Sequence, residues 1–375
     1  MGEPLKNHFG PDIPVRLASM IKGVYSAFDS DGFVAHALEG YEELELKDRG
    51  RKLAESLSAY LPESFPESAD ILVRSAGPKL LKTEGNGMAP FLYFPHVCYI
   101  EQHGLEHFDA AMQAQYELTQ RFSAEFSIRP YIRRYTEEAL TLLAEWTTDS
   151  SEHVRRLVSE GTRPRLPWAS RIPEFQEDPS SVITLLERLK DDPSLYVRRS
   201  VANNLNDIGK DNPEILLDLA ERWSVNADPN RKWLIKHGLR SLIKQGDVRA
   251  LAVLGIGGSE NLQITASQIR PDPAVVGDSI VISYTVQNLS DENVSVMADF
   301  RVHYIKSNGK ARPKVFKLKA FDLAGGESEV LRKKISVADM TTRKHYPGMH
   351  KVDALLNGTI AEIGQFELKA RIEIG

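Results

Sequence analysis

The sequence predicts an α-helical repeat domain followed by an all-β sandwich domain, and three observations lead to this prediction. Residues 1–255 carry apolar side chains at spacings of three and four, the pattern of amphipathic helices. Residues 260–375 alternate apolar and polar side chains between short turn segments, the pattern of strands. Within the first region one segment recurs after 43 residues, as helical repeats do. We therefore expect one domain over 1–255 and a second over 260–375.

The helical spacing is clearest in four segments of the first region. In each of them the apolar residues form one stripe that a helix can bury against its neighbours. These segments are 15–28, 49–61, 111–126 and 181–190.

The repeat indicates how the helices are arranged. DSSEHVRRLVSEG (149–161) and DDPSLYVRRSVANNL (191–205) share D-x-x-x-x-V-R-R, so that Arg156 matches Arg199, and a weaker third copy begins at Asp228. A period of about 40–47 residues with Asp-Pro before a helix is typical of HEAT repeats, in which paired helices stack into a solenoid. We expect the second helix of each repeat to line the concave surface, where a partner would bind.

The region after residue 260 contains seven segments with the strand pattern. They are 261–267, 278–290, 294–307, 314–321, 328–337, 350–358 and 363–374. Seven short strands in a region of this length fit an immunoglobulin-like sandwich. The single cysteine, Cys98, argues against the disulfide of antibody domains but not against the sandwich.

Composition narrows the class of protein. The chain has 375 residues, 42% hydrophobic and 26% charged, which is ordinary for globular domains. A lone cysteine, an N-terminus (MGEPLKNHFG) without the apolar core of a signal peptide, and the lack of a membrane-length apolar run together predict a cytoplasmic protein. We expect a monomer. Because the net charge is −5, a nucleic-acid partner would need local basic patches.

Such patches are predicted along the second helices. Paired arginines on stacked helices would form a row of cations that can follow a phosphate backbone. The alternative is ion pairing within one helix, as between Arg156 and Glu160 at spacing i, i+4. The candidate DNA-binding residues are Arg129, Arg156, Arg163, Arg165, Arg199 and Lys236.

Trp168 closes the basic segment TRPRLPW (162–168). An aromatic side chain next to proline is more often a core anchor than a ligand platform. Here Pro164 and Pro167 stiffen the segment and arginines flank it, so the indole could stack on a base or sugar or hold a cation against its face.

A zinc site is a second possibility. HGLEH (103–107) matches the H-x-x-E-H pattern of inverted zinc peptidases, with His103 and His107 as ligands and Glu106 as base. Gly104 weakens the helix that this pattern needs, and no third carboxylate ligand is evident. We therefore predict no metal and no cofactor.

Several segments together resemble a known family. They are PLKNHFG, LASMIKGVYSAFD, LEGYEELELKDRGRKLAESLSAYLP, and RFSAEFSIRPYIRRY through HVRRLVSEGTRPRLPW. With the basic repeats and the terminal sandwich, they resemble the AlkC branch of the HEAT-repeat alkylpurine DNA glycosylases over essentially the whole chain. The resemblance implies a DNA repair enzyme that binds alkylated duplex DNA and hydrolyses the N-glycosidic bond of cationic bases such as 3-methyladenine.

The resemblance also implies roles for individual residues. Glu125 is the first choice for a catalytic carboxylate that stabilises an oxocarbenium-like sugar, and Glu160 and Asp207 are further acids on the same face. Trp168 would form an aromatic wall. Whether Glu125 or Glu160 lies closer to the sugar stays open. In the related AlkD branch an aromatic residue occupies a second-helix position that is Asn203 or Asn204 here, so pocket details of that branch do not carry over.

Two further questions stay open. The sandwich could add DNA contacts through the basic segments 332–336 and 341–348, or those charges could only aid solubility. A HEAT and immunoglobulin-like scaffold without catalysis is the rival interpretation. Since no Schiff-base lysine stands out, the enzyme interpretation implies a monofunctional glycosylase.

Overall fold

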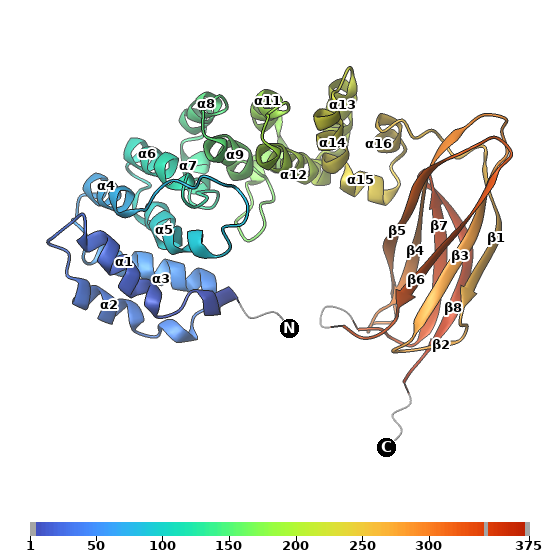
Figure 1. The fold of residues 1–375 in the computed structure, drawn as a ribbon, viewed down its shortest axis with the longest axis horizontal. Coiled ribbons are helices and arrows are strands. Elements are labelled where there is room, and N and C mark those ends of the chain that lie inside the picture. Colours follow the sequence, from blue (N-terminus) through green and yellow to red (C-terminus); the bar gives the residue numbers. More distant parts are fainter. Residues whose placement is uncertain (1–4, 341–343, 372–375) are drawn as a thin grey trace. The chain divides into compact units, whose positions relative to one another are not determined.

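The computed structural model describes residues 5–340 and 344–371. Residues 341–343, within the basic segment 341–348, lie outside the described residues. The chain forms two compact units, one of Met1–Asn212 with Asp228–Gly238 and the other of Pro213–Ala227 with Leu239–Gly375. Figure 1 shows that helices precede strands along the chain.

The first unit consists of helices. Their bounds are α1 (Asp12–Lys22), α2 (Ser30–Leu38), α3 (Leu46–Ser58), α4 (Phe65–Ser75), α5 (Phe94–His103), α6 (Phe108–Thr119), α7 (Arg129–Arg134), α8 (Thr136–Trp146), α9 (Glu152–Gly161), α10 (Pro173–Glu177), α11 (Ser180–Leu189), α12 (Leu195–Asp211) and α14 (Pro229–Gly238). Short 3₁₀ helices lie at Leu5–His8, Tyr41–Glu43 and Ala89–Tyr93. The other unit adds α13 (Pro213–Ser224), α15 (Arg240–Gln245) and α16 (Val248–Val253).

Two helices are shorter than the sequence predicts. The segment 15–28 stays helical only to Lys22, where Gly23 follows. The segment 111–126 leaves the helix at Thr119, so Glu125 lies in the turn before α7 and not on a helix. In this turn the Ser123 hydroxyl accepts a bond from the Glu125 amide (3.4 Å) and donates to the Glu125 carboxylate (2.8 Å). Such local bonds compete with helix formation.

The first arginine of each repeated V-R-R motif links neighbouring repeats. Arg155 donates to the carbonyls of Asp149 and Ser150, just before its own helix, and to both carboxylate oxygens of Asp192 in the next repeat. Arg198, one repeat later, donates in the same way to the carbonyls of Asp192 and Pro193 and across to Asn230. The first arginine of each pair therefore holds neighbouring repeats together. The second, Arg156 or Arg199, is the one that remains for another role.

We expect His96 to make the stability of the helical unit depend on pH. Its ring is fully buried on α5, where Nε2 contacts the Ser75 hydroxyl at 3.2 Å. Burial, together with the charge of Arg121, lowers the pKa of His96 from 6.5 to about 4. Between these values the unfolded chain binds a proton at His96 that the folded chain does not. The contribution of His96 to the free energy of unfolding is therefore fully present above pH 6.5 and falls as the pH drops toward 4.

We expect the free energy of unfolding to fall by about 2 kcal/mol between pH 7.5 and pH 5 through this one group. Urea titration of the far-UV signal at both pH values measures the loss. The variant His96→Leu should lose correspondingly less over the same interval. Equal losses in the two proteins would show that His96 is not the group responsible.

The second unit contains the sandwich. Its strands are β1 (Leu262–Arg270), β2 (Ala274–Val275), β3 (Ser279–Asn288), β4 (Val294–Ile305), β5 (Ala311–Leu323), β6 (Ser328–Ser336), β7 (Gly348–Leu356) and β8 (Thr359–Lys369). They form one sheet in the order β1-β3-β6 and another in the order β2-β8-β7-β4-β5. Each of the seven predicted strand segments corresponds to one of these strands. The two-residue β2, paired in parallel with β8, is too short to leave a pattern in the sequence.

The sandwich core follows the alternation that predicted it. Along β3, Ile280, Ile282, Tyr284 and Val286 are buried while the residues between them are partly exposed. Phe300 and Phe366 from the five-stranded sheet belong to the same core cluster. The predicted fold class, helical repeats followed by an immunoglobulin-like sandwich, is confirmed.

Candidate active site

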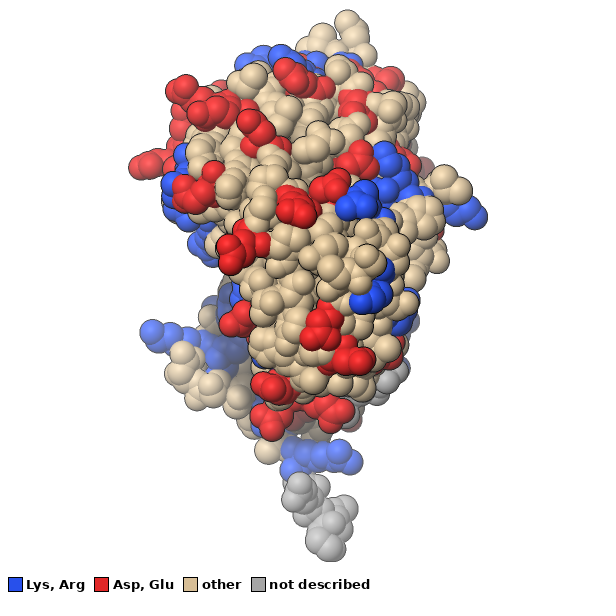
Figure 2. All heavy atoms as spheres, turned by 90° about the vertical axis from the view of Figure 1, so that its left-hand side faces the viewer, with Lys and Arg blue, Asp and Glu red and all other residues tan. Residues whose placement is uncertain are grey.

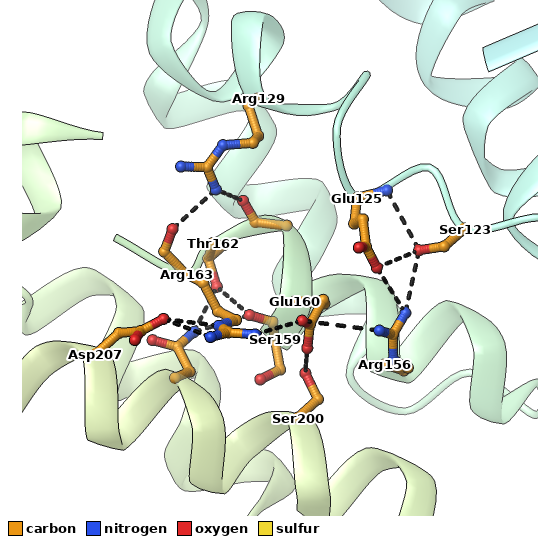
Figure 3. A network of polar contacts seen from close by, with 12 residues as sticks. Ser123, Glu125, Arg129, Arg156, Ser159, Glu160, Thr162, Arg163, Ser200 and Asp207 are labelled. Atoms are coloured by element: carbon orange, nitrogen blue, oxygen red, sulfur yellow. Dashed lines mark hydrogen bonds and ion pairs between the residues drawn. The ribbon is translucent and has the colours of Figure 1, made fainter. Parts of the chain in front are cut away.

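Glu125 lies in the turn between α6 and α7, held by two side chains. Its Oε2 accepts hydrogen bonds from the Ser123 hydroxyl (2.8 Å) and from Arg156 Nη1 (2.9 Å), as Figure 3 shows. Among the described residues no hydrogen bond falls on Oε1. Because both partners hold one oxygen, the carboxylate is fixed in orientation while the other oxygen is left for a ligand.

Glu160, on α9, is the more deeply buried acid. Its side chain is 6% exposed, against 17% for Glu125. One oxygen accepts from Arg163 Nη1 at 2.6 Å and lies 3.7 Å from Arg156 Nη2, and the other accepts from the Ser200 hydroxyl at 2.6 Å. Burial alone would raise the pKa of Glu160, but the two guanidinium groups outweigh burial and hold the pKa below its ordinary value. Glu160 is therefore ionised and its oxygens are occupied.

Asp207, on α12, does not reach the same space. Its side chain is 1% exposed, and it accepts from Arg163 Nε at 2.8 Å and from Lys210 Nζ at 2.7 Å. Arg163 thus lies between Glu160 and Asp207 (Figure 3), with a side chain only 8% exposed. Asp207 thus contacts Arg163 and Lys210, and it is not among the residues that line the pocket around Glu125 and Glu160.

The structure corrects the prediction that Arg129 and Arg163 bind DNA. Arg129 is 1% exposed, and its guanidinium donates to the carbonyls of Gly161, Arg163 and Ser170. Burial, with the nearby charge of Arg163, lowers the pKa of Arg129 to about 10, so it is still charged at neutral pH. Arg129 braces the loop after α9, and Arg163 neutralises two buried carboxylates. Neither offers its guanidinium to a phosphate.

Arg156 is also committed to partners within the protein. Its side chain is 17% exposed and contacts Glu125, Glu160 and the ring face of Tyr196, whose centroid lies 4.8 Å from the guanidinium carbon. Burial lowers the pKa of Arg156, but the neighbouring carboxylates more than compensate and the net shift is upward. Arg156 is therefore placed to hold Glu125 rather than to contact DNA first.

A pocket of about 340 Å³ joins the two glutamates to Trp168. Aromatic side chains of Phe91, Phe94, Phe122 and Phe126 line it, together with Glu125, Glu160, Arg163, Ser123, Leu46, Lys47, Leu166, Pro167 and Trp168. The pocket is within the range of small-ligand sites and combines apolar walls with a few polar groups, as such sites do. Of the four predicted catalytic residues, it brings together Glu125, Glu160 and Trp168.

Trp168 is not a core anchor, although that is the more common role of an aromatic residue next to proline. It is 65% exposed, and its backbone has φ 65°, in the left-handed region that bulky residues rarely adopt. An exposed indole held in a costly backbone conformation points to a role outside packing.

The remaining candidate cations lie on successive elements of the helical unit. Arg165 is paired with Asp211, while the Arg199 side chain is 48% exposed and 3.4 Å from Glu84. Lys236 is exposed on α14. On the face in Figure 2, acidic side chains are interspersed with basic ones, so that face does not form a continuous cationic surface.

Sequence reasoning missed several residues of the site. Ser123 and Ser200 hold carboxylates, and serines in such places carry no distinctive pattern. Phe91 and Phe94 come from a segment that the repeat does not cover. Lys47 lies 121 residues from Trp168 in the sequence, and only the fold shows that the two residues are in contact.

The segment HGLEH does not form the single helix that the zinc-peptidase pattern requires. Helix α5 ends at His103, so His103 and His107 do not share a helix. Their rings pack on Tyr99 and Phe65, and Glu106 pairs with Arg134 at 2.8 Å. Within residues 5–340 and 344–371, no group of three potential metal ligands is clustered.

Within residues 5–340 and 344–371, no helix is both long and apolar enough to cross a membrane.

Fold and site define a class: helical-repeat proteins with a buried carboxylate–arginine network and a C-terminal immunoglobulin-like domain. Residues 263–370 match the family described as the C-terminal Ig-like domain of the uncharacterised protein YhaZ. The uncharacterized protein YhaZ of Bacillus subtilis (strain 168) is 35% identical over 365 residues, covering 97% of this chain and 99% of YhaZ.

A solved structure resembles the whole chain. The alkylpurine DNA glycosylase AlkC of Pseudomonas fluorescens, bound to DNA containing an abasic site analog, matches with a TM-score of 0.89 and 39% identity. The match covers 99% of this chain and 100% of that one. The chain belongs to the AlkC and YhaZ family.

Proposed function

We propose that this protein is a DNA glycosylase that removes cationic methylated bases, such as 3-methyladenine, from duplex DNA. The observation that carries the proposal is the Glu125 carboxylate, oriented through Oε2 by Ser123 and Arg156 and open at Oε1, in a pocket with Trp168 at its rim. The full-length likeness to a DNA-bound alkylpurine glycosylase supports it. We infer a cofactor-independent, cytoplasmic monomer that associates with the nucleoid when bound to DNA.

The chemistry follows from the charge of the lesion. A base made cationic by methylation leaves as a neutral molecule, so it needs little protonation. Its departure makes the sugar electron-poor at C1′, and a fixed carboxylate nearby stabilises that charge without reorganising. Glu125 Oε1 can also orient or deprotonate the attacking water. The Trp168 face favours a cationic sugar or base.

The supporting residues have distinct roles in this proposal. Arg156 and Arg163 keep Glu160 ionised, and Arg156 fixes Glu125. Asp207 fixes Arg163 from behind. Since Glu160 has both oxygens occupied and Glu125 does not, Glu125 is the acid that we place closest to the sugar.

Incubation with methylated duplex DNA tests the proposal. Bases released by the purified protein are separated and quantified, with DNA incubated alone as the control for spontaneous loss. We expect release of methylated bases, and DNA strands that stay intact until alkali is added, as for a monofunctional enzyme. If release never exceeds the spontaneous rate, the glycosylase proposal fails, and a non-catalytic scaffold becomes the better interpretation.

The exposed cations on α12 and α14 lead to a prediction about binding. In the variants Arg199→Met and Lys236→Met, the slope of log binding constant against log salt concentration should shrink by about 0.9 each, because one phosphate contact is lost. Fluorescence anisotropy with duplex DNA over a salt series measures this slope. The single-turnover rate at saturating protein should not change.

Arg188 provides the matched control, since it is an exposed arginine on α11, the other helix of the same repeat. Arg188→Met should leave the slope as in the wild type. If all three variants show the wild-type slope, the predicted cation row does not contact phosphates.

A further inference from the structure

The loop that carries Trp168 is held from two sides. On one side, Arg129 binds the carbonyls of Gly161, Arg163 and Ser170. On the other side, the Lys47 ammonium donates a hydrogen bond to the carbonyl of Trp168 itself, at 2.5 Å. Lys47 therefore holds the one residue of the loop whose backbone occupies the left-handed region.

Lys47 occupies an unusual place for a lysine. It lies in the first turn of α3, which begins at Leu46, and the positive end of the helix dipole disfavours a cation there. Within the described residues no carboxylate lies within salt-bridge distance of Lys47, and its ammonium is 5.7 Å from the Phe126 ring centroid. The ammonium contacts Trp168 and Phe126, and its charge also acts on the Glu101 carboxylate, where it opposes the rise in pKa that burial causes.

Lys47 and Trp168, with Leu46, line two neighbouring hollows. Both residues line the pocket that contains Glu125 and Glu160. Both also line a second hollow of about 500 Å³, next to Arg51 and the N-terminal residues Leu5 and Lys6. The indole is 65% exposed, so few packing contacts hold it, and the bonds from Lys47 and Arg129 hold the backbone of its loop.

We propose that Lys47 is a positioning residue of the site: by binding the Trp168 carbonyl it holds the indole at the rim of the Glu125 pocket. This inference rests on the proposed glycosylase function for its consequence, but not for the contact. Lys47 acts on the reaction through Trp168 and touches neither base nor sugar. A small displacement of a positioned group can reduce a rate by about 10²-fold.

A double-mutant cycle tests this inference. Single-turnover excision of 3-methyladenine at saturating protein is measured for wild type, Lys47→Met, Trp168→Ala and the double variant. We expect Lys47→Met to lower the rate by about 10-fold or more, and to have little further effect once Trp168 is alanine, because the two residues act as one unit. If Lys47→Met has no effect, or costs as much with alanine at 168 as with tryptophan, the inference is overturned.

Two further variants separate position from charge. Arg51 lies four residues along α3, on the same face, and lines the same second hollow, but no bond joins it to Trp168. Arg51→Met should therefore leave the single-turnover rate near the wild-type value, and Lys47→Arg should recover part of the lost rate. Equal loss in Arg51→Met and Lys47→Met would show that charge, and not the bond to Trp168, matters.

Fluorescence tests the contact without catalysis. Of the four tryptophans, Trp146 and Trp223 are buried, so in the variant Trp233→Phe the main quenchable indole is Trp168. Lys47→Met in that background should increase quenching by acrylamide, while Arg51→Met should not. If wild-type protein excises no base, the proposed function fails, and this measurement alone decides on the contact: unchanged quenching overturns it.

Discussion

Glu125→Gln is expected to lower the single-turnover rate of 3-methyladenine excision by about 10²–10³-fold, the usual consequence of removing one preorganised electrostatic group. Glutamine keeps the size and one oxygen of the side chain but not the negative charge that stabilises the sugar cation. The fold should survive, since Arg156 retains Glu160 as a partner. Thermal melting of the variant checks the fold, and quantified base release checks the rate.

Glu106 supplies the control for this substitution. It is an exposed glutamate paired with Arg134, outside the pocket. Glu106→Gln should excise at the wild-type rate. A Glu125→Gln enzyme of full activity would remove Glu125 from the catalytic role while leaving the glycosylase assignment intact.

Arg163→Met is expected to lower the free energy of unfolding by about 3–5 kcal/mol, the cost of leaving buried charges without their partner. Arg163 is the guanidinium between Glu160 and Asp207, whose side chains are 6% and 1% exposed. The deficit should narrow in acid, because Glu160 in the variant has lost a group that depresses its pKa and can protonate more readily. Urea denaturation at pH 7.5 and pH 5 measures both effects.

Arg165→Met is the comparison that isolates burial. Arg165 also forms a paired contact with a carboxylate, Asp211, but the two side chains are 24% and 17% exposed. Loss of a more solvated pair should cost only about 1 kcal/mol or less. A loss below about 1 kcal/mol in Arg163→Met as well would contradict the buried network as a source of stability.

The sequence carried most of the architecture because repeats and alternation are local patterns. The V-R-R motif at a spacing of 43 residues and the alternating strands were sufficient to predict both fold types. Helix ends were harder to predict from the sequence. The turn at Glu125 contains hydrogen bonds with Ser123, and such bonds leave no periodic pattern in the sequence.

The candidate site was predictable in its residues more than in their roles. Glu125, Glu160 and Trp168 line one pocket, and the catalytic role that we propose for them stays a prediction. Arg129 and Arg163 looked like DNA contacts because a sequence shows charge but not burial, and both prove to be enclosed by their own partners. Lys47 could not be found, because a contact across 121 residues leaves no trace in spacing.

The central claim is that a carboxylate assists departure of a base that already carries positive charge. Single-turnover excision from two duplexes tests it most directly: one contains 3-methyladenine, and the other an uncharged isostere in which carbon replaces the methylated ring nitrogen. The two lesions have the same shape and differ in charge. We predict that the protein releases 3-methyladenine and leaves the isostere in the DNA. Release of both at similar rates would contradict the account, because a neutral base would then be leaving with help from an acid that this mechanism does not include.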